Sequence, residues 1–228
     1  SPPAGSLSLF GAMEDDHKQV RADTAQALGR IGAADRELCD TVLGPLADAF
    51  EDENASVEKA AIQAIGRIGE AHPEVLTDEH VSAIVARLDH TDELVRAAAA
   101  AAIGAIAEGG LEQDINVIPL VNLLDDYYLQ PRIEACGALA TLGVNEVVER
   151  IAPLQTHYDE GVQAAASEAL EALDYDSSEN DTEPASAADD ASASVVSDIP
   201  TAEAADDNTS ATSSRTEATA DSVDDTLA

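Results

Sequence analysis

The 228-residue sequence has no tryptophan, and only 3% of its residues are aromatic. Its two lysines, Lys18 and Lys59, belong to a set of only 11 basic residues, which face 46 acidic ones and leave a formal net charge of -35. This balance disfavours nucleic-acid binding, because contacts to phosphate groups need clustered lysine and arginine. No run of 18 or more apolar residues is present, so we expect no membrane-spanning segment and no membrane partner.

Cysteine is equally scarce. Cys39 and Cys136 are the only two, and they lie far apart in the sequence. A disulfide framework or a zinc site needs closer or paired spacing, so we interpret both as small core residues of a protein in a reducing compartment. The first residues, from Ser1 to Gly5, lack the charged start and apolar segment of a secretory signal. The predicted location is the cytoplasm.

The acidic excess extends along the whole chain. Residues 1–174 contain 32 acidic and 10 basic residues. At low salt such self-repulsion destabilises a compact fold, whereas molar salt shortens the Debye length to about 3 Å and screens it. An acidic composition with little lysine and few aromatics is therefore typical of a halophile, and we expect a halophilic archaeon as the source. On this interpretation most of the charge serves hydration.

A phrase of 13 residues occurs five times. The copies start 37, 38, 36 and 31 residues apart, at Val20, Val57, Val95, Pro131 and Val162. Within the first copy, Ala25, Leu28 and Ile31 follow the starting residue with the spacing of one helix face. A second apolar, helix-sized segment lies between successive copies, at residues 38–50, 81–88, 115–124 and 147–154.

Each unit is therefore predicted to be a helix, a turn and a second helix, stacked on its neighbours to bury a continuous core. The predicted fold is all-α: a solenoid of about five helix pairs over residues 1–174. Its N-terminal repeat is incomplete, because Leu7 to Met13 supply only about two turns. Glycine destabilises a helix by about 1 kcal/mol relative to alanine, so its recurrence at Gly29, Gly66 and Gly104 needs another reason. We predict that these glycines allow neighbouring helices to pack closely. Those at Gly32, Gly69 and Gly143 predict left-handed caps.

The recurring pattern Leu-x-Asp-x-x-x-x-Val-Arg-x-x-Ala-x-x-Ala-Leu-Gly resembles HEAT-like repeats of the phycobilisome-lyase type, over about residues 10–174. In that family the Asp and the Arg hydrogen-bond along the stack. The Asp position holds Asp15, Asp52, His90, Asp126 and His157, and the Arg position holds Arg21, Glu58, Arg96, Arg132 and Gln163. Only the first and fourth copies keep both, so the resemblance implies a structural ladder at Asp15, Arg21, Asp126 and Arg132.

A candidate binding surface lies off the apolar stripe. Gln26 and Arg30 in the first copy correspond to Gln63 and Arg67 in the second, and each pair is one helical turn apart. The resemblance implies that these helices line the concave surface. The row continues with small residues, at Ala101, Ala105, Gly137 and Thr141. It fits an acidic helix or loop of a partner; the alternative is that both arginines pair with nearby carboxylates.

Markers of catalysis are absent from the sequence, which has no Ser/His/Asp constellation, P-loop or dinucleotide-binding fingerprint. Iron hydroxylases of the same superfamily carry repeated His-Glu dipeptides, whereas this chain has only the reversed Glu79-His80. His90 and His157 share a repeat position but are two repeats apart, roughly 20 Å, too far for one metal. A bilin lyase would need an aromatic-rich cleft.

We therefore predict no catalytic residue, no metal and no cofactor. The predicted function is a non-catalytic scaffold or adaptor that binds another protein on the concave face. The alternative is a lyase-like or hydroxylase-like enzyme or maturation factor of the HEAT-like superfamily.

The repeats end at about residue 174. Residues 175–228 carry 14 acidic residues and one basic residue, Arg215. Such a composition cannot bury enough apolar surface to offset chain entropy, so we predict a disordered acidic tail. It serves as a solubilising tail or, through Val195, Val196 and Ile199, as a short interaction segment.

Overall fold

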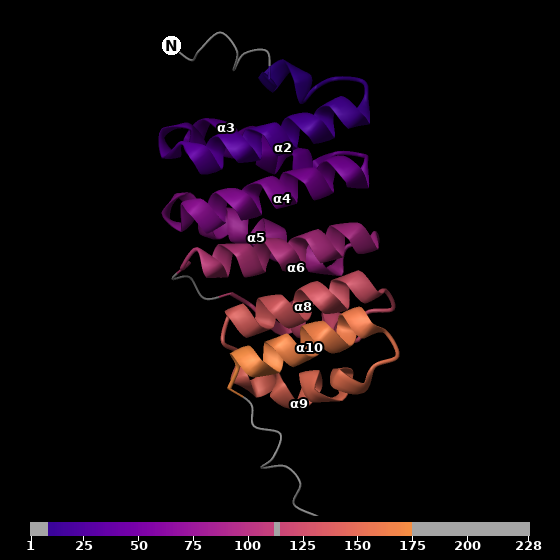
Figure 1. Cartoon of the computed structure of the whole chain (residues 1–228). Helices are drawn as coiled ribbons and strands as arrows, with labels where there is room; N and C mark the ends of the chain where they lie inside the picture. Colours follow the sequence, from indigo (N-terminus) through magenta and orange to yellow (C-terminus); the bar gives the residue numbers. More distant parts are fainter. Residues whose placement is uncertain (1–8, 112–114, 175–228) are drawn as a thin grey trace, which may run out of the picture. The chain divides into compact units, whose positions relative to one another are not determined.

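The computed structural model describes residues 9–111 and 115–174 (Figure 1). All regular structure in these ranges is helical. The repeated phrase forms the long helices α2 (Lys18–Ala34), α4 (Ala55–Ala71), α6 (Glu93–Glu108), α8 (Leu129–Thr141) and α10 (Glu160–Ala172). Shorter helices precede the last four of these: α3 (Cys39–Asp48), α5 (Asp78–Ala86), α7 (Ile118–Leu123) and α9 (Val148–Ile151).

Short 3₁₀ segments flank the shorter helices. They are η1 (Arg36–Leu38), η2 (Ala49–Glu51), η3 (Pro73–Val75), η4 (Arg87–Asp89), η5 (Asn145–Val147) and η6 (Ala152–Thr156). Residues 9–12 are helical as well and precede α2. The predicted all-α solenoid is therefore confirmed. The predicted tail at 175–228 lies outside the described residues.

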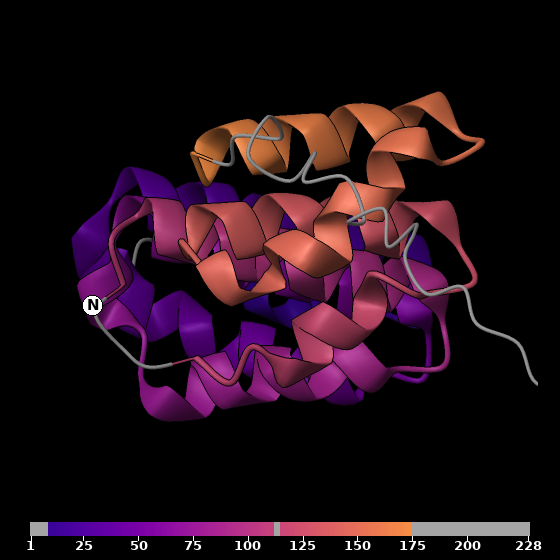
Figure 2. The ribbon, with the colours of Figure 1, turned by 90° about the horizontal axis from the view of Figure 1, so that it is seen from below.

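Each long helix packs on the next, in the order α2, α4, α6, α8 and α10. They run side by side with their N-terminal ends at the same edge, on the right in Figure 1. Seen along the stack, the long and the short helices form two layers (Figure 2). The turns that enter the long helices consequently line up along one edge of the array.

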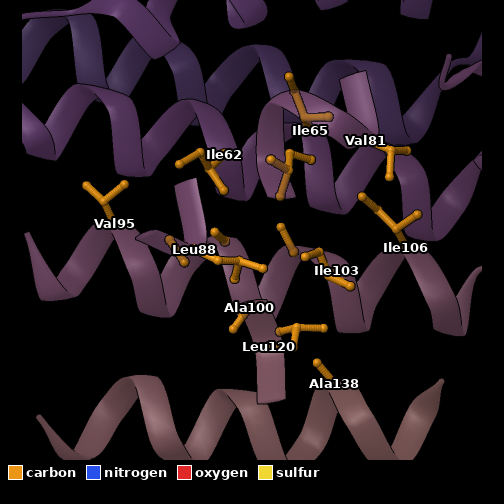
Figure 3. Packing of buried hydrophobic residues seen from close by; sticks show 14 of the residues in the cluster. Ile62, Ile65, Val81, Leu88, Val95, Ala100, Ile103, Ile106, Leu120 and Ala138 are labelled. Carbon is orange, nitrogen blue, oxygen red and sulfur yellow. The ribbon is translucent and has the colours of Figure 1, made fainter. Parts of the chain in front are cut away.

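The core lies between the two layers and continues from one repeat to the next. Isoleucines of α4 and α6 meet apolar residues of the shorter helices, as Ile62, Ile65, Val81, Leu88, Ile103 and Leu120 show in Figure 3. Cys39 and Cys136 are free thiols within it, both buried. Burial raises the pKa of Cys136 to about 11. This continuity explains why a single repeat would have too little apolar area to fold alone.

Glycine sets the spacing between neighbouring long helices. A Cβ built on Gly29 would lie 2.6 Å from the Cα of Ala64, and one on Gly66 would lie 2.8 Å from the Cβ of Ala102. At Gly104 the corresponding distance, to the Cα of Ala138, is 3.4 Å. The prediction of close packing at these positions is confirmed, with the tightest approach between α2 and α4.

The cap prediction holds at only one of its three positions. Gly143 has a positive φ of 65° after the end of α8. Gly32 and Gly69, by contrast, lie inside α2 and α4, so the prediction of left-handed caps there is wrong. Their role is packing, because a Cβ on Gly32 would lie 2.7 Å from the Cδ1 of Ile68.

Two of the shorter helices are briefer than their apolar segments predict. α7 has six residues and α9 has four. Pro119 sits in the first turn of α7, where proline marks a helix start, so the helix does not extend toward residue 115. The apolar segment around α9 continues instead as the 3₁₀ segment η6, which contains Pro153 in its first turn.

Candidate protein-binding surface

Arginines of the long helices reach into the turn of the following repeat. Arg21 donates to both carboxylate oxygens of Asp52, at 2.7 and 2.8 Å, and to the backbone carbonyl of Asp15 at 2.8 Å. Arg96 repeats this arrangement with Asp126, at 2.7 and 2.9 Å, and with the carbonyl of His90 at 2.7 Å. Bidentate pairs of this kind are among the stronger hydrogen bonds in proteins. Each arginine thus binds two successive turns together.

Two members of the implied ladder have less regular partners. The carboxylate of Asp15 accepts a hydrogen bond from the backbone N–H of His17 at 2.8 Å. Arg21 donates to the backbone carbonyl of Asp15 and not to its carboxylate. Arg132 donates to the backbone carbonyl of Asp126, and its Nη1 lies 3.3 Å from Nε2 of His157. The structure therefore places the ladder between repeats, with the arginine of one copy facing the Asp or His position of the next.

Glu58 occupies the arginine position of the second copy, with the opposite charge. It is buried, and its carboxylate accepts from Nε of Arg87 at 2.7 Å and lies 3.3 Å from Nε2 of His90. Arg87 also donates to Glu51 at 2.7 Å and to the carbonyl of Phe50 at 2.9 Å. The charge reversal is therefore compensated by a cation from the neighbouring shorter helix segment η4.

Pairing with arginine lowers the pKa of two carboxyl groups, those of Asp52 and Asp126. Hydrogen bonds from Arg21 hold the pKa of Asp52 below its ordinary value, against a smaller effect of burial. Burial raises the pKa of Asp126, but hydrogen bonds from Arg96 and from the backbone N–H of Tyr128 outweigh it and leave that pKa lowered. Both groups are consequently held in the charged form that the arginines bind.

The predicted binding residues lie on α2 and α4, where Arg30, Gln63 and Arg67 are exposed and Gln26 is half-buried. Within the described ranges the guanidinium groups of Arg30 and Arg67 make no ion pair and no hydrogen bond, so the alternative that both pair with carboxylates is not what these ranges show. The other arginines of the described ranges all have such partners: Arg21, Arg36, Arg87, Arg96, Arg132 and Arg150.

Lys59 extends this surface and is not among the predicted residues. It lies four residues before Gln63 and eight before Arg67, so the three share one side of α4. Like the two guanidinium groups, its ammonium group has no ion-pair or hydrogen-bond partner within the described part of the chain. The four-residue spacing was the available sequence signal. We call the set Gln26, Arg30, Lys59, Gln63 and Arg67 the cationic face.

Beyond the cationic face the same row becomes small and neutral. Ala101 and Ala105 of α6 are half-buried, and Gly137 and Thr141 of α8 are exposed. A Cβ on Gly137 would meet nothing within 4 Å. The hydroxyl of Thr141 donates to the carbonyl of Gly137 at 3.0 Å, so it is turned back to its own helix. The side chains of α6 and α8 thus leave room beside the charged groups of α2 and α4.

Two open pockets lie among the shorter helices. One of about 340 Å³ is lined by residues that include Phe50, Ile65, His80 and Arg87. A neighbouring one of about 290 Å³ includes Phe10, Met13 and Pro45. In residues 9–111 and 115–174, no three His, Cys, Asp or Glu side chains are grouped as a metal site would require, and no described helix is both long and apolar enough to cross a bilayer.

Comparison with known proteins agrees with the repeat architecture. The sequence matches the HEAT repeats family over residues 7–78 and again over 43–119. No curated protein matches it. A chain of the complex of CpcE and CpcF of phycocyanin lyase from Nostoc sp. PCC7120 has a TM-score of 0.59 at 21% identity, over 76% of this chain and 66% of that one.

Designed repeat proteins are similar too. A designed armadillo repeat protein in complex with the peptide (KR)4 has a TM-score of 0.57 at 28% identity, over 75% of this chain and 82% of that one. A computationally designed armadillo repeat protein for modular peptide recognition has a TM-score of 0.55 at 29% identity, over 75% and 83%. The HEAT repeats match over residues 7–119 and the stacked helix pairs of the structure agree on a helical-repeat architecture.

Proposed function

We propose that this chain is a non-catalytic scaffold that binds an acidic segment of another protein through the cationic face. One observation carries the proposal: in a chain of net charge -35, two exposed arginines and Lys59 have no partner among the described residues and share one surface. The HEAT-like resemblance assigns this surface to the concave side of the solenoid. We further propose that the protein works in the cytoplasm of a halophile and binds no nucleic acid.

The chemistry of the face fits a partner's carboxylates. Arg30 and Arg67 present two planar guanidinium groups, and Gln26 and Gln63 add amide donors and acceptors one turn away. At molar salt, long-range attraction is screened and only close, directional contacts such as bidentate arginine pairs persist. The designed armadillo repeat protein solved with a bound peptide supports peptide binding by arrays of this type, although its peptide is basic.

The test is capture of partner proteins from native extract in about 2 M KCl, where repulsion is screened. The bait is the full chain, either unchanged or as the Arg30→Glu/Arg67→Glu variant. The matched control is Arg36→Glu/Arg150→Glu, which makes the same charge change at exposed arginines outside the face. We expect a partner that the unchanged chain and the control retain and the first variant loses. Equal retention by both variants would remove the cationic face from the binding site.

The alternative is a lyase-like or hydroxylase-like enzyme or maturation factor, for which the similarity to the phycocyanin lyase complex is the supporting observation. At 21% identity that similarity concerns the fold. Visible absorbance and metal content of protein purified from its native source separate the two functions. A bound chromophore or stoichiometric iron would overturn the non-catalytic proposal, and a colourless, metal-free protein that still captures a partner would support it.

A further inference from the structure

Tyrosine is concentrated at one edge of the last two repeats. Tyr127, Tyr128 and Tyr158 are the tyrosines of the described ranges, and their exposed fractions are 88%, 46% and 84%. Tyr127 and Tyr158 each lie four residues before the start of a repeated phrase. The same position in the first three copies holds polar residues, namely Asp16, Glu53 and Thr91. Exposed aromatic rings in so aromatic-poor a chain point to a contact surface, because tyrosine is enriched at protein interfaces.

The ladder holds these turns in place. Arg96 binds Asp126 bidentately, its guanidinium carbon lies 5.9 Å from the ring centroid of Tyr128, and the N–H of Tyr128 donates to Asp126 at 2.9 Å. Arg132 then joins the carbonyl of Asp126 to the ring of His157, which lies 4.2 Å from the ring of Tyr158. The tyrosines therefore lie on turns that are already ordered. Binding a partner consequently costs little backbone conformational entropy at these turns.

Carboxylates lie beside the rings in sequence. Asp125 and Glu160 are exposed and Asp159 is half-buried. Asp125 already accepts from Nη2 of Arg150 at 2.7 Å, and Arg96 already combines a carboxylate with a tyrosine ring. These contacts within the chain show that a carboxylate and a tyrosine ring of this edge can each bind a guanidinium group. We call the set Tyr127, Tyr128, Tyr158, Asp125, Asp159 and Glu160 the tyrosine edge.

We infer that the tyrosine edge docks an arginine-bearing segment of a partner protein. A guanidinium is planar and weakly hydrated, so it can face a carboxylate and a ring at once, which an ammonium does less well. Molar salt screens the charge attraction but leaves the ring contacts, which favours a tyrosine-lined acidic surface over a purely acidic one. The edge lies on the turns that enter α8 and α10, whereas the cationic face lies along α2 and α4. This inference therefore does not depend on the proposed function.

The test uses the full chain and two fluorescein-labelled peptides of equal charge, octaarginine and octalysine, followed by anisotropy in about 2 M KCl. We expect octaarginine to bind more tightly. The Tyr127→Ala/Tyr158→Ala variant should bind octaarginine about fivefold to twentyfold more weakly, as expected for two exposed cation–π contacts. Tyr127→Phe/Tyr158→Phe keeps both rings and should bind like the unchanged chain.

The matched control is Asp16→Ala/Glu53→Ala, which alters the same turn position in the first two repeats and removes two negative charges. It should leave octaarginine binding within about twofold of the unchanged chain, because screened charges away from the edge contribute little. Equal affinity for the two peptides, unchanged binding by the alanine pair, or an equal loss in the control would overturn the inference. So would sedimentation showing a dimer that the alanine pair dissociates, since the edge would then cover a second copy.

Discussion

The glycine contacts between long helices give a graded prediction for replacement by alanine. In a helix, alanine is favoured over glycine by about 1 kcal/mol. Overpacking a tight contact costs about 1–3 kcal/mol. The added methyl would lie 2.6 Å from Ala64 at Gly29 and 2.8 Å from Ala102 at Gly66, so both variants must push neighbouring helices apart. Gly29→Ala and Gly66→Ala should therefore lower the free energy of unfolding, by up to about 2 kcal/mol.

Gly137→Ala is the matched control, because this glycine lies inside α8 and an added methyl would meet nothing within 4 Å. It should raise the free energy of unfolding by about 1 kcal/mol. Gly104→Ala should fall between the two outcomes, since its methyl would stand at 3.4 Å from Ala138, an ordinary contact distance.

The assay is thermal unfolding followed by far-ultraviolet circular dichroism, with all variants in the same high-salt buffer. In an array of this size 1 kcal/mol corresponds to about 2–4 °C in Tm. The expected order of Tm is Gly137→Ala highest, then Gly104→Ala, then Gly66→Ala and Gly29→Ala. If Gly29→Ala stabilised the array as much as Gly137→Ala, close approach of α2 and α4 would not be the reason for glycine there.

Three further predictions concern charge and the tail. The array should be fully helical in about 2 M KCl and lose helicity on dialysis to low salt; equal circular dichroism and equal Tm at both salt concentrations would refute the halophilic interpretation. Because the pKa of Asp52 is lower in the folded than in the unfolded chain, its stabilisation is present above about pH 4 and lost as pH falls through the lowered value. Asp52→Asn should therefore have a lower Tm at pH 7 and a smaller fall in Tm on acidification, and an unchanged pH profile would contradict the role of its pair with Arg21. Deletion of residues 178–228 should leave Tm nearly unchanged; a drop of many degrees would show that the tail docks on the repeats.

The period and the helical spacing were sufficient to predict the long helices, because each copy buries the same face against the same neighbours. The phrase from Val20 to Gly32 lies wholly inside α2, which runs from Lys18 to Ala34. The left-handed cap predicted at Gly32 is wrong because this glycine is required instead by its close contact with Ile68 of the next repeat, and sequence spacing does not show contacts between repeats.

The same limit applies to the sites. The partner of Arg21 is Asp52, 31 residues away, and Glu58 is compensated by Arg87 from another helix segment. Such pairings depend on how neighbouring repeats stack. The four-residue spacing between Lys59 and Gln63 was sufficient to predict that Lys59 belongs to the cationic face. The sequence could not show that the side chains of Arg30 and Arg67 lack partners among the described residues, because arginine pairing depends on how the repeats stack.

The central claim is that a partner protein covers the cationic face, and thiol protection tests it most directly. Gln63→Cys places a thiol on the face, and Ser82→Cys places one at an exposed position of α5. The native Cys39 and Cys136 are buried with raised pKa values, so both should react slowly with a maleimide. Without the captured partner, the two new thiols should react at similar rates. With it, the account predicts several-fold slower labelling of Gln63→Cys and unchanged labelling of Ser82→Cys; unprotected Gln63→Cys, or equal protection of both, would contradict it.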